Sequence, residues 1–280
     1  MKKIALLALA TIVACSGATA KTSTKSKTQK STVATSATGK KKVTTMAPGP
    51  QLTNAQAGKK WFVEERYEKA LPYLLKAVDE GDTDSKVRLA YMIFTAQVPE
   101  YSIDQTEAIK MLDECIDSGS VYALERKGFC ILAMSADVKE EKLKGIDLLK
   151  QASDKGNGDA SAELFNAYRE GVKSYASGEY YIEPNDSLAT AYVRLAAEQE
   201  NQEGTAYMGL YTYMGTHGIE RNTEAGVQLL EKAYGMSERF FTTNCLEPAK
   251  TLAAYYTEKG NTAKATRITT LLKKYHPTEF

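Results

Sequence analysis

The sequence has little of the chemistry that most enzymes need. Its 280 residues include two histidines, His217 and His276, and neither has a cysteine or carboxylate at metal-ligand spacing. No HExxH, CxxC, GxSxG or phosphate-binding glycine loop occurs, which disfavours zinc hydrolases, serine hydrolases and nucleotide enzymes. Carboxylates brought together only by the fold leave little local pattern. We therefore expect a protein that is not an enzyme and that uses no metal and no other cofactor.

Long apolar runs are also missing beyond the N-terminus. Residues 1–20, MKKIALLALATIVACSGATA, combine two lysines, a short apolar run and small residues, as export signals do. Cleavage after Ala20 would release a soluble protein. Alternatively, the run ending at Cys15 resembles a lipoprotein signal, in which Cys15 is lipidated and tethers the chain to a membrane. Both routes predict an exported protein that is secreted, periplasmic or anchored to the outer membrane.

Cysteines are few, and three follow the signal: Cys115, Cys130 and Cys245. An odd number in an exported chain argues against a disulfide framework. Cys115 and Cys130 would be offset by about 9 Å along paired helices, which is too far for a bridge. We expect these cysteines to be small core residues.

Residues 21–50 contain no acidic and no aromatic residue, but seven lysines among Ser, Thr, Ala and Gly. Such a segment cannot bury enough apolar surface to offset the entropy of ordering, so we interpret it as a disordered basic tether. It either contacts anionic lipid or cell-wall polymer, or is a solvated spacer. Residues 51–280 hold 27 basic and 35 acidic residues, a net charge of −8, which argues against nucleic-acid binding.

A repeat begins at residue 51. One column of mostly small residues recurs every 37 to 44 residues, at Ala70, Ala108, Gly145, Ala189, Gly226 and Ala265. A second column alternates with it, at Gly58, Ala90, Gly128, Phe165, Gly209 and Ala253. Small and aliphatic residues at helical spacing suit closely packed helices, several of which should end near Gly81, Gly119 and Gly156. The pattern predicts an all-α solenoid of about six helix pairs in residues 51–280, because each pair leaves an apolar face for its neighbour.

The repeat resembles a known superfamily. Residues 58–77, GKKWFVEERYEKALPYLLKA, resemble a tetratricopeptide repeat, with Gly58, Trp61 and Tyr67 in consensus columns. LFNAYREGV (164–172) and MGLYTYMGTHGI (208–219) resemble the related Sel-one-like repeat, whose units are longer. The chain lacks the paired cysteines of that family's secreted cysteine-rich branch, so no activity of that branch is expected.

This resemblance implies an α-α superhelix whose first helices line a concave face that binds a protein or peptide. The family's groove columns fall on Tyr91, Phe94, Phe129, Leu132, Asn166, Arg169, Leu210 and Tyr213. Arg169 could hold a carboxylate through two parallel hydrogen bonds, whereas the aromatic members could instead fill space between helices. We interpret the protein as a non-catalytic interaction scaffold of the bacterial cell envelope. The alternatives are a cell-wall or polysaccharide-associated enzyme or accessory factor, and a purely structural spacer.

Two stretches interrupt the repeat. Residues 173–187, KSYASGEYYIEPNDS, lengthen the fourth unit and predict a protruding loop. Its tyrosines either serve binding or pack over the adjacent helix. The stretch ERFFTTNCLEP precedes the last pair, and we expect Phe240 and Phe241 within it to be core residues.

Overall fold

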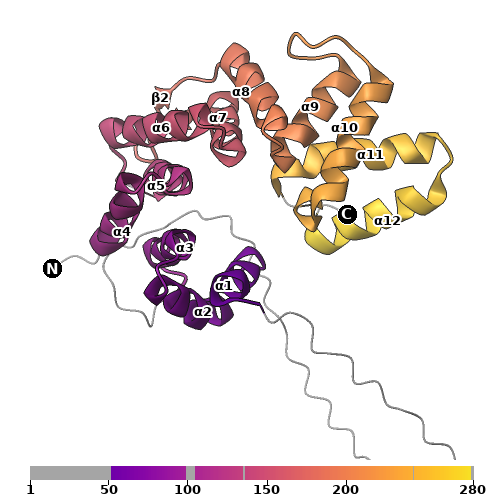
Figure 1. The fold of residues 1–280 in the computed structure, drawn as a ribbon. Coiled ribbons are helices and arrows are strands. Elements are labelled where there is room, and N and C mark those ends of the chain that lie inside the picture. The colour runs from indigo at the N-terminus through magenta and orange to yellow at the C-terminus, as the bar shows by residue number, and fades with distance from the viewer. Residues whose placement is uncertain (1–51, 99–104, 135, 242, 279–280) are drawn as a thin grey trace, which may run out of the picture. The chain divides into compact units, whose positions relative to one another are not determined.

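In a computed structural model of the chain, the described residues are 52–98, 105–134, 136–241 and 243–278. The predicted signal and tether, with Cys15, lie outside them. The described part has twelve α-helices: α1 (Asn54–Val63), α2 (Tyr67–Asp79), α3 (Thr83–Phe94), α4 (Gln105–Asp117), α5 (Val121–Met134), α6 (Lys139–Asp154), α7 (Gly158–Glu170), α8 (Asp186–Glu198), α9 (Gln202–Met214), α10 (Thr223–Met236), α11 (Leu246–Glu258) and α12 (Thr262–Tyr275). They form six successive pairs, in which the odd-numbered helix is the first and the even-numbered helix is the second (Figure 1).

Polar caps and left-handed glycines set the ends of these helices. An asparagine side chain accepts a hydrogen bond from a backbone N–H of the first turn in five of them, α7, α8, α9, α10 and α12. Each such bond satisfies a donor that the helix itself leaves free. The predicted stops at Gly81, Gly119 and Gly156 are confirmed, with φ of 88°, 91° and 87° directly after second helices. Glycine adopts this conformation without the steric cost that a side chain would add.

The two helices of a pair approach closely where their small residues meet. A Cβ atom on Gly226 would lie 2.5 Å from the backbone nitrogen of Tyr213 and 2.8 Å from the carbonyl oxygen of Gly209. Gly128 and Gly145 meet in the same way in the third unit. The predicted second-helix column is buried in all six units, so the register of the repeat is confirmed.

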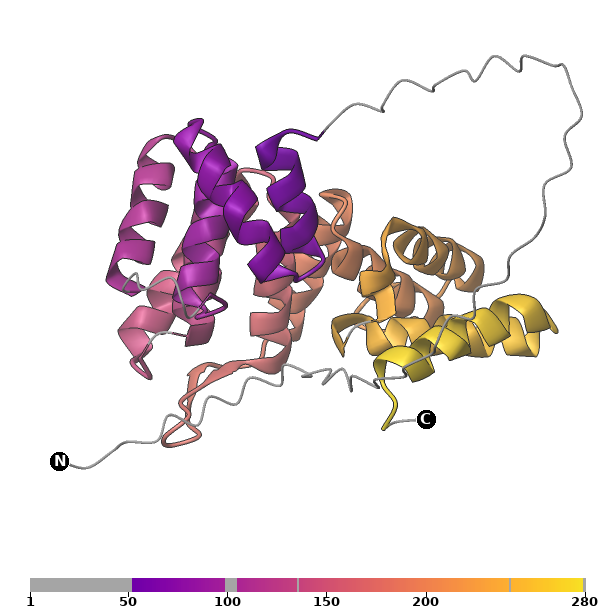
Figure 2. The ribbon, with the colours of Figure 1, turned by 90° about the horizontal axis from the view of Figure 1, so that it is seen from below.

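In successive pairs, both helices of one pair pack against the first helix of the next. Each first helix from α1 to α9 contacts the next first helix, whereas no two second helices in the described part make comparable contacts. Helices that touch along the array lie on the inside of its curve, so the first helices form the concave face. Figures 1 and 2 show the helix pairs following one another from α1 to α12. This is the α-α solenoid that the sequence predicted.

The apolar core is a series of clusters along the array. Leu74 and Met92 lie in a cluster of the first units, Leu164 and Val193 in a central one, and Leu252 in the last. The last cluster also contains the predicted core residues Phe240 and Phe241, which are 0% and 1% exposed. Both lie in the first of two short 3-10 segments, Glu238–Phe241 and Thr243–Cys245, that precede α11. Cys115, Cys130 and Cys245 are buried thiols, as predicted, and burial raises the pKa of Cys130 to about 12.

The insertion at residues 173–187 contains a small antiparallel hairpin, β1 (Val172–Lys173) and β2 (Tyr180–Ile182). Ser174 Oγ donates a hydrogen bond to Asp137 Oδ2 at 2.8 Å, and the Tyr181 hydroxyl donates to the carbonyl of Asp137 at 3.0 Å. The hairpin is therefore latched to the connection between α5 and α6. No helix of the described part is long and apolar enough to cross a membrane.

Candidate functional site

The face formed by α3, α5, α7 and α9, here called the first-helix face, carries the residues that the family's groove columns predict. Seven of the eight are half-buried: Tyr91, Phe129, Leu132, Asn166, Arg169, Leu210 and Tyr213. The eighth, Phe94, is 6% exposed and belongs to the core of the first units, so it is not accessible to a partner. The structure brings Tyr91 and Phe129 together, with ring centroids 6.1 Å apart. A role of the seven in binding stays a prediction.

Arg126 on α5 lies among three aromatic rings. Its guanidinium carbon is 5.2 Å from the ring centroid of Tyr91, 5.5 Å from that of Tyr122 and 5.8 Å from that of Phe129. Its Nε donates to Glu125 Oε2 at 2.6 Å. Because the faces of aromatic rings attract cations, Arg126 is held from several sides.

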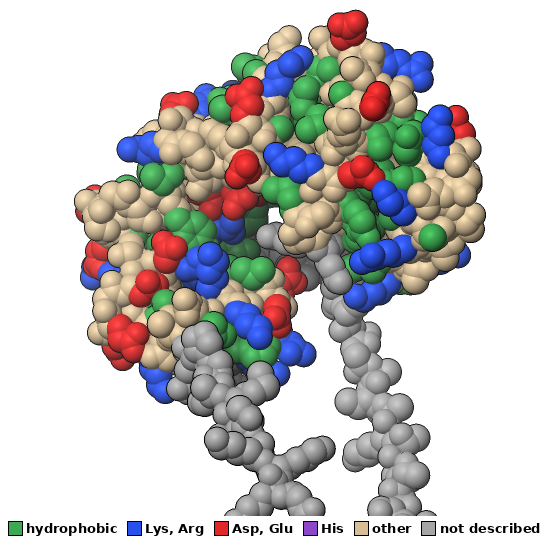
Figure 3. All heavy atoms as spheres, turned by 45° about the vertical axis from the view of Figure 1, so that its right-hand side comes forward, with side chains coloured by type: hydrophobic (Ala, Val, Ile, Leu, Met, Phe, Trp, Pro, Cys, Tyr) green, Lys and Arg blue, Asp and Glu red, His purple; other side chains and the backbone are tan. Residues whose placement is uncertain are grey.

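Arg169 on α7 is held in a similar way. Its guanidinium carbon is 4.7 Å from the ring centroid of Phe165 and 4.6 Å from that of Tyr207 on α9. Its Nη2 donates to Glu170 Oε1 at 2.6 Å. Figure 3 shows one side of the molecule, on which acidic, basic and hydrophobic side chains lie next to one another. The first-helix face thus presents two arginines that are fixed against rings.

Glu125 is the most deeply buried carboxyl group of this face. Its side chain is 1% exposed, and its Oε1 has no hydrogen-bond partner among the described residues. Burial raises the pKa of Glu125 to about 7, although Arg126 opposes the shift. Carboxyl groups perturbed in this way are concentrated at functional sites.

Two further carboxyl groups lie on α7 and α9. Burial, with the negative charges of Glu203 and Glu125, raises the pKa of Glu163 to about 8. Glu203 accepts hydrogen bonds from Asn166 Nδ2 at 2.8 Å and Asn244 Nδ2 at 3.1 Å, and burial still leaves its pKa above the usual value. The buried Oδ1 of Asn166 has no hydrogen-bond partner in the described part. We call Glu125, Glu163, Asn166 and Glu203 the acidic centre.

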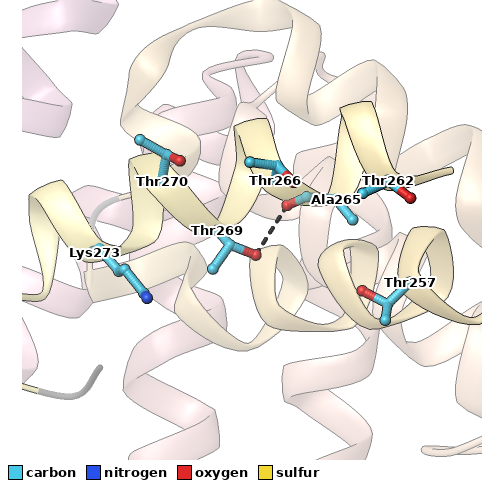
Figure 4. A pocket seen from close by; sticks show the side chains of 7 residues that line it. All are labelled: Thr257, Thr262, Ala265, Thr266, Thr269, Thr270 and Lys273. Atoms are coloured by element: carbon cyan, nitrogen blue, oxygen red, sulfur yellow. Dashed lines mark hydrogen bonds between the residues drawn. The ribbon is translucent and has the colours of Figure 1, made fainter.

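Two hollows of the described part are lined by none of the arginines, rings or carboxyl groups described above. One is lined by α11 and α12 through Thr257, Thr262, Ala265, Thr266, Thr269, Thr270 and Lys273 (Figure 4). The other is lined by residues near the ends of α2 and α4, including Val78 and Ser118. No group of three or more His, Cys, Asp or Glu side chains that could hold a metal ion is found in the described part.

Sequence reasoning placed Asn166 and Arg169 on this face but missed Glu125, Arg126 and Glu163. Glu125 lies three positions and Arg126 two positions before Gly128 of the small-residue column, and Glu163 lies two positions before Phe165 of the same column. These positions are outside the columns that the family resemblance supplied. In the second, fourth and fifth units the position of Glu125 is taken by three buried apolar residues: Val87, Ala162 and Ala206. An acid at a position that is apolar in the neighbouring units was the pattern that could have revealed Glu125.

No protein-family model matches the sequence, and no curated protein matches it significantly. Solved structures do match. A Sel1 repeat protein from Oxalobacter formigenes is similar with a TM-score of 0.50 and 17% identity, over 78% of this chain and 83% of that one. A protective antigen of uropathogenic Escherichia coli strains, which displays an SLR fold, is similar with a TM-score of 0.48 and 20% identity, over 79% of this chain and 45% of the antigen. The chain therefore has the fold of Sel1 repeat proteins, an all-α solenoid of helix pairs.

Proposed function

We propose that the protein is a non-catalytic binding scaffold, exported to the bacterial cell envelope, that holds a protein or peptide on its first-helix face. The observation that carries this proposal is the pair of arginines fixed against aromatic rings. The side chains of Arg126 and Arg169 are 20% and 24% exposed, so each remains partly accessible. Donors that are ordered before binding lose little entropy when a partner arrives. Arginine and aromatic side chains are also those that concentrate binding energy at interfaces.

Site-specific cross-linking in the native envelope tests the face. A photoreactive amino acid at Phe129 or Tyr213 should trap a defined partner, because both residues are half-buried on first helices. The same amino acid at Ala191, which is exposed on the second helix α8, is the matched control. Equal trapping at all three positions would contradict binding on the first-helix face.

Paired arginine variants then test the side chain that the sequence singled out. Arg169→Ala should weaken binding of the trapped partner by roughly tenfold or more, as loss of a charge-assisted contact predicts. Arg194→Ala removes an exposed arginine of α8 and should leave the affinity unchanged. If the two variants bind the partner with equal affinity, Arg169 is not part of the binding site.

One observation favours the second candidate function, an enzyme or accessory factor that acts on cell-wall polysaccharide. Glycoside hydrolases use a carboxyl group of raised pKa beside a second carboxylate, and Glu125 and Glu163 have pKa values raised to about 7 and about 8. However, neither residue lines the two hollows described above. Release of soluble fragments from purified cell wall by the wild type, but not by Glu163→Gln, would favour the enzyme over the scaffold.

Attachment to the membrane is a separate proposal, carried by the sequence at Cys15. If Cys15 is lipidated, Cys15→Ala should move the protein from the membrane fraction to the soluble fraction. An unchanged distribution would reject the lipid anchor and favour cleavage after Ala20.

A further inference from the structure

The acidic centre contains acceptors that the described part of the protein does not satisfy. Glu125 Oε1 and Asn166 Oδ1 are buried, and neither receives a hydrogen bond there. Glu163 makes no hydrogen bond or ion pair with a described residue, although Glu125, Asp159 and Glu203 are all close enough to raise its pKa. A buried acceptor without a donor costs roughly 1–3 kcal/mol. A ligand that supplies donors at this point would recover that cost.

Arg126 lowers the pKa of Glu163 and Arg169 lowers that of Glu203, but neither arginine outweighs burial, and both pKa values stay raised. Arg126 already holds Glu125 through Oε2, and Arg169 holds Glu170. The two amide donors that reach Glu203, from Asn166 and Asn244, are neutral. What remains is an excess of carboxyl groups over cations, with unsatisfied acceptor oxygens on Glu125 and Asn166, next to the ring of Tyr207.

We propose that the acidic centre binds a basic side chain, lysine or arginine, carried by an extended peptide segment of the partner. This inference rests on the proposed function, because it assigns a chemistry to the segment held on the first-helix face. An ammonium or guanidinium group carries several N–H donors and a positive charge, so it complements both the unsatisfied oxygens and the excess of acid. An acidic side chain would instead meet further carboxyl groups there.

Selection from a displayed library of random peptides tests the inference on the purified full chain. Peptides that bind the wild type should share a lysine or arginine at one position, and glutamine at that position should weaken binding roughly ten- to hundredfold. Glu163→Gln should weaken binding of the selected peptides to a similar extent. The control variant Glu140→Gln, at an exposed residue of α6, should leave binding unchanged.

The outcomes separate this inference from the proposed function. Two outcomes would overturn the basic-side-chain inference while still supporting the scaffold. In one, the selected peptides require Arg169 but share no basic residue; in the other, they bind Glu163→Gln as tightly as the wild type. If no selected peptide is sensitive to any substitution on the first-helix face, both proposals fail. Glutamine has nearly the shape of glutamic acid, and unfolding curves of both variants at the same pH exclude a loss of fold as the cause.

Discussion

At the scale of single residues, Glu163 makes the stability of the protein depend on pH. Its pKa is raised from 4.5 to about 8, so the folded state prefers the neutral acid. The stability that Glu163 contributes is fully present below about pH 4.5 and is lost as the pH rises through 8. Glu163→Gln cannot ionise. We expect it to be more stable than the wild type at pH 9 by at least about 1 kcal/mol, and to lose that advantage at pH 5.

Urea unfolding at pH 5, 7 and 9 measures this difference. Glu140→Gln, on the exposed surface of α6, serves as the matched variant and should follow the wild type at each pH. A gap between the wild type and Glu163→Gln that does not change with pH would show that the pKa of Glu163 is not raised in the folded state.

Two glycines of α10 should respond to alanine in opposite ways. A Cβ on Gly226 would lie within 3 Å of the backbone of the facing helix, whereas nothing lies within 4 Å of a Cβ on Gly235. We expect Gly226→Ala to destabilise the protein by roughly 1–3 kcal/mol, because the helices must move apart. Gly235→Ala should be neutral or stabilising by up to about 1 kcal/mol, because alanine is the better helix former. Thermal or urea unfolding checks both, and equal stabilities would be evidence against the close crossing.

At the scale of elements, the carboxylate of Asp137 holds the turn that follows β1. Asp137 accepts hydrogen bonds from Ser174 Oγ and from the amide of Ala176, both through Oδ2. Burial raises the pKa of Asp137, but these hydrogen bonds outweigh it and leave the pKa below its usual value. Asp137→Ala should therefore loosen the turn between β1 and β2 and speed hydrogen exchange of the Ala176 amide, while exchange in α9 stays unchanged. Asp137→Asn keeps an acceptor oxygen and should show a smaller effect.

The contact between Asp137 and the hairpin was not predicted from the sequence. The helix pairs were readable because their signal is local and repeated: a small residue recurs at the same place in each unit, and Gly226 shows why. The hairpin was predicted only as a protruding loop, because its strands are two and three residues long and its anchor, Asp137, lies 37 residues before Ser174. Of the acidic centre, only Asn166 was predicted. Glu125 stands out as an acid where neighbouring units have buried apolar residues, but the sequence does not show that the acids meet, because their pKa shifts arise between helices from distances that folding sets.

At the scale of the whole molecule, the series of core clusters implies that stability is distributed along the array. In a solenoid each unit contacts only its neighbours, so damage in one cluster should spread little beyond them. Leu74 and Leu252 are both 0% exposed but belong to clusters in the first and last units. Replacing either by alanine removes a comparable apolar volume, at a local cost of roughly 2–5 kcal/mol.

Hydrogen exchange on the two variants therefore distinguishes a solenoid from a globule. Leu252→Ala should speed exchange in α11 and α12 while α2 and α3 keep their protection, and Leu74→Ala should do the reverse. A single globular core would instead lose protection everywhere in both variants, because all its elements unfold together. The concave face depends on this result. Only an array whose units stack in a row holds the first helices in order along one surface, and only then can Arg126, the acidic centre and Arg169 contact one extended segment.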